Sequence, residues 1–285
     1  IVKGVPNLTA DFLFTAGSST DVTMPQLLVT TLLIIFMTLI IALPLGIAAA
    51  IYLNEYSKKG SKLVKVIRLF IDTLAGIPSI VFGLFGNIFF VAICGGRYSI
   101  IAGSLTMVLI VLPTIVRSTE ESLREVADSM REGSLALGAS KVGTIFKIVL
   151  PSALSGIVTS IILSIGRIVG ESAALIYTAG AVIGMPDGYG SSGMTFAVAM
   201  YKLTQTGRAG DMEKAYAIAV VLLVIVVALN LLVTFLEKRI KRKTLGTTGT
   251  GTEKKRAHAK QEAEEENTEA LEPLAEPAPA EGAKA

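Results

Sequence analysis

Long apolar runs alternate with short charged segments along this chain. Five runs contain no Asp, Glu, Lys or Arg, and most approach the roughly 20 residues that a helix needs to cross a bilayer. They are residues 26–53, 73–94, 98–116, 151–165 with a polar continuation, and 215–236. The pattern predicts an all-α fold, a polytopic transmembrane helical bundle with five spans present here.

A charged segment between the third and fourth runs carries a helical stripe. Apolar or small residues recur there at spacings of three and four, with charged residues between them. The stripe consists of Leu123, Val126, Met130, Ser134 and Leu137. This spacing predicts one amphipathic helix that begins upstream of residue 132.

A turn and a second helix are expected after this stripe. Gly138 occupies the position where a helix ends in a left-handed residue, and Ser140 the position of a side-chain cap. Residues 142–149 then place apolar side chains on one side of a second helix, and Pro151 suits the first turn of the next span. Residues 132–151 are therefore predicted to form helix, sharp turn and helix.

Composition agrees with a membrane protein. The chain is 52% hydrophobic and 17% charged, with a mean hydropathy of +0.64, which is too apolar for an ordinary soluble domain of 285 residues. Cys94 is the single cysteine and His258 the single histidine. An intrachain disulfide and a Cys/His metal site are thereby excluded.

Basic residues predict the orientation of the spans. Residues 54–72 and residues 237–243 are rich in Lys and Arg, so both segments are expected in the cytoplasm. Alternation of the spans then places residues 132–151 in the cytoplasm too, and residues 95–97 and 174–214 outside. The C-terminus is accordingly expected in the cytoplasm.

The two ends of the chain read as extramembrane segments. Residues 1–25 are expected to form an extracytoplasmic loop, and alternation predicts one further span upstream of Ile1, for six in total. The transmembrane domain is expected over residues 26–243, with a cytoplasmic hairpin at residues 117–151. Residues 244–285 hold nine Glu and five Lys or Arg among Thr, Gly, Ala and Pro, and are predicted to be a disordered tail.

Glycines and prolines in the spans indicate close helix packing. Gly76, Gly83 and Gly86 fall on or near one face of the second run, where small residues let helices approach in lipid. Ordinary membrane packing accounts for this spacing. Three prolines are expected as tolerated kinks: Pro44, Pro78 and Pro113.

The chain lacks the sequence features of a catalyst. The glycine-rich residues 246–255 do not place lysine and a hydroxyl residue directly after the final glycine, so they are not a phosphate-binding nucleotide loop. No nucleophile arrangement and no paired carboxylates or histidines occur in the spans. We therefore expect no enzyme activity, and energy from ATP would have to come from a partner chain.

Arg167 and Glu171 are the charged exception near the fourth run. They are four residues apart and are expected on one helix face, at a depth where a charge costs on the order of 2.5 to 3.5 kcal/mol. One interpretation is a substrate pathway in which Arg167 meets an anionic solute and Glu171 orients the guanidinium, whose geometry matches phosphate oxygens. The other is a neutralised structural pair, or snorkelling toward the interface.

Residues 132–151 resemble the cytoplasmic EAA loop of importer-type ABC transporter permeases. In that loop a glutamate is followed after five residues by glycine, and later by the pattern I-x-L-P. The two alanines that follow the glutamate in the family are Gly133 and Ser134 here, which are also small. The resemblance implies ATPase coupling by Glu132, Gly138, Ala139, Ile148, Leu150 and Pro151.

Three further strings resemble phosphate permeases, the last of them the PstA-type subunit: residues 77–86, 166–180 and 45–56. The resemblance implies a type I ABC importer permease fold and one permease half in the inner (plasma) membrane of a prokaryote. It further implies a second, PstC-like permease, two PstB-like ATPase subunits that use ATP and Mg, and an extracytoplasmic phosphate-binding protein. Membrane lipid is the remaining expected partner, and nucleic acid is not expected.

Other function classes stay open at this point. A permease for another oxyanion, such as sulfate or molybdate, has the same features. An ion channel would conduct without nucleotide, and this function would leave the predicted hairpin without a role. A membrane enzyme is disfavoured by the missing nucleophile and metal residues.

Overall fold

A computed structural model of the chain describes residues 4–14, 21–57 and 60–245, and among these residues the regular elements are all helices. The all-α prediction is confirmed. Ile1–Glu237 form one compact unit and Lys238–Ala285 a second, of which the described part is the end of one helix. The predicted tail at residues 244–285 lies, from residue 246 onward, outside the described residues.

Among the described residues, three helices are long and apolar enough to cross a membrane. The first comprises α2 (Met24–Ile51) and its π-helical continuation η2 (Tyr52–Tyr56); the others are α5 (Ile100–Arg124) and α12 (Ala209–Leu245). Two bent helix pairs can supply two more spans. The predicted five spans are therefore obtained when each bent pair counts as one span.

The second run, residues 73–94, is not a single helix. Its first residues end α3 (Lys62–Gly76), and the rest form α4 (Ser79–Gly86) and the π-helical η3 (Asn87–Val91). The two parts are bent by 98°. Pro78 lacks an amide hydrogen and disfavours helical geometry at Ile77, which is extended with ψ 131°. The proline thus breaks this helix, whereas a tolerated kink was predicted; Pro44 and Pro113 do lie inside helices, as predicted.

The fourth run also belongs to a bent pair. Its first part, Lys141–Ser152, ends in α8 (Leu150–Ser152), its second part is α9 (Leu154–Gly170), and the two parts meet at 64°. Pro151 lies in α8, which continues the π-helical segment Ile145–Val149 directly, so it stands just before the bend and not in the first turn of α9.

Close helix approach is confirmed at two of the three glycines. A Cβ atom added to Gly83 would lie 2.8 Å from the Ala174 backbone, and one added to Gly86 would lie 2.2 Å from the Thr106 hydroxyl. No atom lies within 4 Å of a Cβ added to Gly76, so the prediction is wrong for that residue. The packing face therefore belongs to α4 alone.

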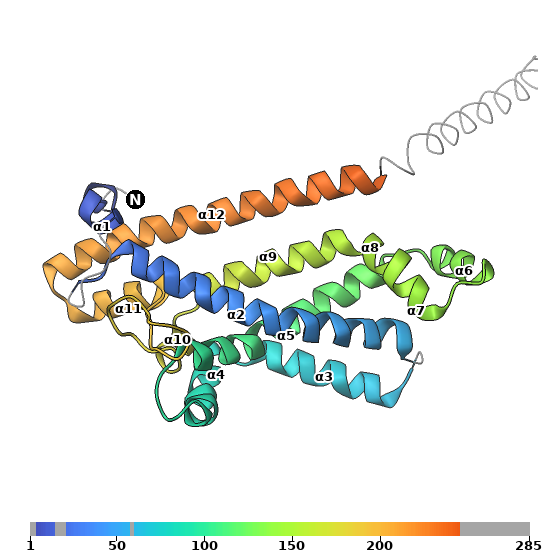
Figure 1. Cartoon of the computed structure of the whole chain (residues 1–285), viewed down its shortest axis with the longest axis horizontal. Helices are drawn as coiled ribbons and strands as arrows, with labels where there is room; N and C mark the ends of the chain where they lie inside the picture. The colour runs from blue at the N-terminus through green and yellow to red at the C-terminus, as the bar shows by residue number, and fades with distance from the viewer. Residues whose placement is uncertain (1–3, 15–20, 58–59, 246–285) are drawn as a thin grey trace, which may run out of the picture. The chain divides into compact units, whose positions relative to one another are not determined.

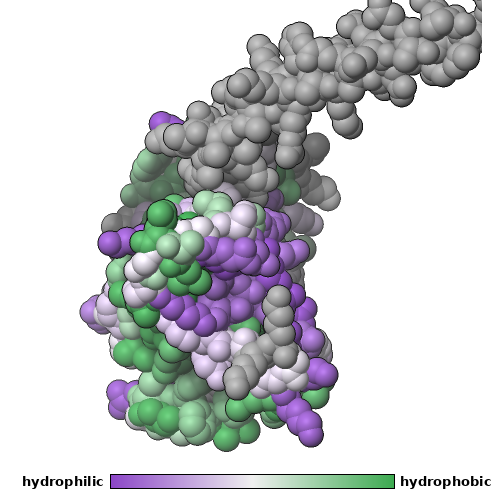
Figure 2. Space-filling view, turned by 90° about the vertical axis from the view of Figure 1, so that its right-hand side faces the viewer, coloured by the Kyte–Doolittle hydropathy of each residue, from purple (hydrophilic) through white to green (hydrophobic). Residues whose placement is uncertain are grey.

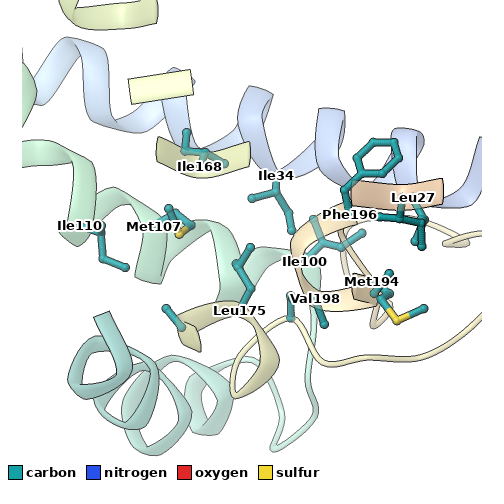
Figure 3. Close-up of a cluster of buried hydrophobic side chains, with 14 of the residues drawn as sticks. Leu27, Ile34, Ile100, Met107, Ile110, Ile168, Leu175, Met194, Phe196 and Val198 are labelled. Atoms are coloured by element: carbon teal, nitrogen blue, oxygen red, sulfur yellow. The ribbon is translucent and has the colours of Figure 1, made fainter. Parts of the chain in front are cut away.

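The main apolar core surrounds α5. Helix α5 packs against α2 and α9, which also contact each other, as Figure 1 shows. Short α10 (Ala173–Ile176) and α11 (Phe196–Thr206) close one end of this core. The buried side chains drawn in Figure 3 include Leu27, Ile34, Ile100, Met107, Ile110, Ile168, Leu175, Met194, Phe196 and Val198.

The N-terminal segment is partly helical. Within residues 1–25, which were predicted to form a loop, the structure contains the 3-10 turn η1 (Val5–Asn7) and α1 (Ala10–Phe14). Phe12 is buried in the main core, so this segment is packed onto the bundle.

Candidate functional site

The predicted hairpin is present between α5 and α9. It consists of α6 (Asp128–Ala136), α7 (Lys141–Thr144) and the π-helical η4 (Ile145–Val149), followed by α8. Gly138 has φ +82°, the left-handed conformation expected there. The Ala139 amide donates to the Ser134 carbonyl at 3.2 Å and the Gly138 amide to the Leu135 carbonyl at 3.0 Å. These two bonds form the Schellman motif that ends a helix in a glycine.

Two hydroxyl contacts fix the second arm. The Gly143 amide donates to the Ser140 side chain at 3.1 Å, which confirms Ser140 as the cap of α7. The hydroxyls of Ser134 on α6 and Thr144 on α7 are 2.9 Å apart and buried. The arms are therefore joined by the turn and by a side-chain contact.

The stripe that begins at Leu123 is divided between two helices. Helix α5 ends at Arg124 and α6 begins at Asp128, with Ala127 extended at ψ 135°. Leu123, Val126 and Ser134 are buried, but Leu137 is 91% exposed. The prediction of one continuous amphipathic helix is therefore wrong. The break at residues 125–127 changes the direction of the chain, so Met130 and Leu137 are exposed, and Ser134 is buried against Thr144 of the second arm.

The tip of the hairpin is an exposed apolar surface. Its large apolar side chains are Met130, Leu135, Leu137, Val142 and Phe146, all exposed. Of the predicted coupling residues, Glu132, Gly138, Ala139 and Pro151 are exposed, and Ile148 and Leu150 are half-buried. Figure 2 faces the end of the unit where α6 and α7 lie in Figure 1, and shows hydrophilic side chains bordered by hydrophobic ones there.

Arg131 of this hairpin makes contacts that were not predicted from the sequence. Its Nε and Nη2 atoms donate to Glu55 Oε1 at 3.2 and 2.9 Å, although the two residues are 76 positions apart. Nη1 and Nη2 also donate to the carbonyls of Val126 at 2.5 Å and Leu123 at 2.6 Å. The available signal was the position of Glu55, the first charge after a long apolar run.

Charged side chains also join α3 to α5. Glu120 Oε1 accepts hydrogen bonds from Nη2 of Arg68 and Nη2 of Arg124, each at 2.6 Å, and Arg117 pairs with Asp72. Glu120 is buried, and it is neutralised by the two guanidinium groups. These contacts place several arginines at one end of the bundle, close to the hairpin.

Arg167 and Glu171 do not share a helix face. Helix α9 ends at Gly170, and Glu171 is extended with ψ 124°, so the expected i, i+4 relationship is absent. The Glu171 carboxylate instead accepts a hydrogen bond from the Ala174 amide at 3.1 Å, at the start of α10. Arg167 is exposed, and among the described residues no hydrogen bond or ion pair holds its guanidinium. The expected pairing of Arg167 with Glu171 is therefore wrong, while the pathway interpretation and snorkelling of Arg167 toward the interface both stay predictions.

Metal ligands do not cluster in the described part of the chain. Within residues 4–14, 21–57 and 60–245, no group of three or more His, Cys, Asp or Glu side chains could hold a metal ion.

Comparison with known proteins identifies what this arrangement resembles. Residues 42–242 match the family described as "Binding-protein-dependent transport system inner membrane component". The chain is 38% identical over 182 residues to a probable ABC transporter permease protein, YqgI, of Bacillus subtilis, which covers 63% of this chain and 62% of that protein. It is 37% identical over 208 residues to the phosphate transport system permease protein PstA 1 of Mycobacterium tuberculosis, which covers 71% and 67%.

The matches cover only part of these relatives. The chain spans 62% of the length of the Bacillus protein and 46% of a phosphate transport system permease protein PstA of Mycobacterium leprae, to which it is 45% identical over 141 residues. The family match, residues 42–242, runs from within α2 into α12, so it includes the hairpin and the elements between these two helices but only the later part of α2.

Solved structures share the fold. An inward-facing conformation of the MetNI methionine ABC transporter matches with a TM-score of 0.54 at 23% identity, covering 77% of this chain and 93% of that chain. A bacterial ABC transporter involved in import of the acidic polysaccharide alginate matches with a TM-score of 0.56 at 15% identity, covering 76% and 79%. The arrangement of helices is therefore that of ABC importer permeases.

Proposed function

This chain belongs to the family of binding-protein-dependent transport system inner membrane components, and from that premise we propose that it is one permease half of an ATP-driven importer of inorganic phosphate. The chain is a multi-pass membrane protein with a type I ABC importer permease fold. Relatives that are 37% to 45% identical carry the name of phosphate transport permeases, which supports phosphate over sulfate or molybdate. The chain itself is non-catalytic in this proposal.

The proposed assembly has one copy of this chain and a second, PstC-like permease in the membrane. Two PstB-like ATPase subunits bind ATP and Mg on the cytoplasmic side, and a phosphate-binding protein delivers the solute from outside. The C-terminus lies in the cytoplasm, because the basic residues 237–243 follow the last span.

The hairpin is the proposed docking element for the ATPase. Its exposed tip offers apolar side chains, among them Leu135, Leu137 and Phe146, on a short rigid support. Apolar side chains that project from a rigid helical turn suit a pocket on a partner. In the proposal Glu132, Gly138 and Ala139 shape the tip, and Ile148, Leu150 and Pro151 join it to α9.

Arg167 is the proposed contact for phosphate in the translocation pathway. Its guanidinium is exposed and unpaired among the described residues, so its donors are available to an anion. For Glu171 we propose a role other than orienting the Arg167 guanidinium, which was the prediction from the sequence. By accepting from the Ala174 amide it fixes the turn between α9 and α10, and thereby the direction in which the end of α9 points.

Transport in this scheme is alternating access. Closure of the ATPase subunits moves the hairpin, and the spans attached to it switch the pathway between inward and outward opening. The observation that carries the proposal is the exposed, conformationally fixed hairpin on a chain that has no nucleotide-binding loop of its own. An ATP-driven permease that does not itself bind nucleotide requires a docking surface through which an ATPase subunit can act on it.

Uptake of labelled phosphate tests the proposal. Proteoliposomes should contain the full-length chain with its co-purifying subunits, with and without ATP, and with sulfate as a competitor. We expect uptake only with ATP, and no inhibition by sulfate. Flux without nucleotide would identify a channel, and equal competition by sulfate would identify a general oxyanion permease.

A further inference from the structure

The end of the first long span contacts both arms of the hairpin. Segment η2 continues α2 without a break and carries two adjacent contact residues. Glu55 pairs with Arg131 of α6, and the ring of Tyr56 lies 4.9 Å from the Lys141 ammonium of α7. A span that is remote in sequence is therefore held to the hairpin by one ion pair and one cation–π contact.

Arg131 joins three parts of the chain. Besides Glu55, its guanidinium reaches the carbonyls of Leu123 and Val126 and the carboxylate of Asp128, at 3.1 Å. Carbonyls at the end of a helix lack intrahelical partners, so Arg131 satisfies the end of α5 while it binds α2. The side chains of Arg131 and Glu55 are only 16% and 8% exposed, and this pair is therefore weakly screened.

An apolar cluster lies beneath the ion pair. Leu53 of η2, Leu123 at the end of α5, and Ile145 and Val149 of η4 belong to one buried group. The polar contacts and this cluster together hold η2 and the hairpin as a single packed piece. Movement of the hairpin therefore cannot leave η2 in place without breaking the Arg131–Glu55 pair.

We propose that Arg131 and Glu55 are positioning residues that transmit movement of the docking hairpin to the span α2. The inference rests on the proposed function. The chain connects the hairpin covalently to α5 and α9 but not to α2, which follows the hairpin only through packing and side-chain contacts. The Arg131–Glu55 pair is the ion pair that joins the hairpin to this span in the described part of the chain. A buried pair with satisfied hydrogen bonds suits this role, since removal of one partner leaves the other charge uncompensated.

The choice of variants separates this link from other contacts of Arg131. Glu55→Gln removes the charge that binds α2 but leaves the bonds from Arg131 to the Leu123 and Val126 carbonyls. Asp128→Asn is the matched control, because it removes the charge of the other carboxylate that pairs with Arg131. The Asp128 side chain is 78% exposed and lies on the hairpin itself. A third variant, Glu55→Gln with Arg131→Gln, removes both charges and leaves no buried unpaired charge.

The first measurement is phosphate imported per ATP hydrolysed, in proteoliposomes of the complete complex with equal amounts of bound ATPase subunit. We expect Glu55→Gln to lower this ratio about tenfold, because the span then no longer follows the hairpin in most cycles of ATP hydrolysis. Asp128→Asn should retain the ratio, and the double variant should assemble normally yet remain uncoupled. Recovery of the ratio in the double variant, or an unchanged ratio in Glu55→Gln, would overturn the proposal by showing a purely structural pair.

The second measurement needs no phosphate. Spin labels replace Phe36 of α2 and Leu231 of α12, both exposed, in a Cys94→Ser background. We expect bound nucleotide to change the distance between the labels in the wild type and in Asp128→Asn, but not in Glu55→Gln. A wild type without this change would overturn the inference, whereas a wild type that shows the change and hydrolyses ATP but imports no phosphate would overturn only the proposed function.

Discussion

The hydroxyl groups of Ser134 and Thr144 form a buried hydrogen bond of 2.9 Å between the two arms of the hairpin. Thr144 also donates to the Ser140 carbonyl at 3.1 Å, so its single proton is used and Ser134 acts as donor to Thr144. We expect Thr144→Val to destabilise the hairpin by about 1 to 3 kcal/mol, because the Ser134 hydroxyl then lacks an acceptor. Hydrogen exchange of the α6 and α7 amides measures the effect.

The double variant Ser134→Ala with Thr144→Val is the control for this bond. It removes both hydroxyls, and we expect protection close to that of the wild type, since no buried polar group is left without a partner. Equal loss of protection in the single and double variants would show that packing of the threonine, rather than the hydrogen bond, holds the arms together.

Gly138 should be sensitive to substitution through its backbone conformation. No atom lies within 4 Å of a Cβ added to Gly138, but its φ of +82° strains any other residue. We expect Gly138→Ala to cost about 1 to 2 kcal/mol, and Gly138→Val to uncouple phosphate uptake from ATP hydrolysis while membrane insertion stays intact. The ratio of phosphate imported to ATP hydrolysed measures the uncoupling.

Gly133 provides the matched control for Gly138. It lies five residues earlier, inside α6, and a Cβ added there also meets no atom within 4 Å. Gly133→Ala should therefore stabilise α6 by up to about 1 kcal/mol through helix propensity. If both alanine variants lowered coupling alike, the added side chain at the docking surface would be responsible, and not the turn.

These local features explain what the sequence could and could not predict. The turn at Gly138, the cap at Ser140 and the long spans follow from interactions within a few residues, and all were predictable. The break at Ile77 and Pro78 was misjudged, because a proline inside an apolar run is compatible with either a kink or a helix end. The pairing of Arg131 with Glu55 depends on helix packing across 76 positions, which spacing along the chain does not reveal.

Arg167 should affect transport rather than assembly. Its side chain is exposed and makes no hydrogen bond or ion pair within the part of the chain that the structure describes. We expect Arg167→Gln to reduce phosphate uptake about tenfold or more, since a hydrogen bond to a charged group contributes about 1.5 to 3 kcal/mol. ATPase subunits should co-purify with the variant at the wild-type level.

Arg167→Lys distinguishes charge from geometry at the same position. Lysine keeps the positive charge but loses the planar fork that matches two phosphate oxygens. Intermediate uptake would support direct contact with phosphate. Loss of co-purifying subunits in either variant would instead indicate that Arg167 binds a neighbouring chain.

The contact between Asp21 and Lys214 should make stability depend on pH in the acid range. Lys214 donates to Asp21 at 2.8 Å, and this hydrogen bond and the lysine charge lower the pKa of Asp21 below its ordinary value. A lowered pKa in the folded protein means that the contact stabilises above the ordinary aspartate pKa of about 4 and is lost as the pH falls below it.

Asp21→Asn tests this dependence. In detergent, the wild type should unfold at a slightly higher temperature than the variant at pH 6, and the difference should vanish as the pH falls through the lowered pKa. The effect should be small and should decrease with added salt, because the contact is exposed. A difference that persisted in strong acid would contradict the assigned cause.

The three glycines near the break in the second run should respond differently to alanine. A Cβ at Gly83 would press on the backbone of Ala174, which cannot rotate away, and a Cβ at Gly86 would press on the Thr106 and Thr178 side chains. We expect each variant to destabilise the bundle by about 1 to 3 kcal/mol, with the larger effect at Gly83.

Gly76→Ala is the control, since its Cβ would meet no atom within 4 Å and its helix α3 should tolerate or favour alanine. Thermal unfolding in detergent ranks the three variants. Equal destabilisation by all three would contradict the close approach of α4 to its neighbours, because Gly83 lies against α10 and Gly86 against Thr106 of α5 and Thr178, whereas Gly76 meets neither.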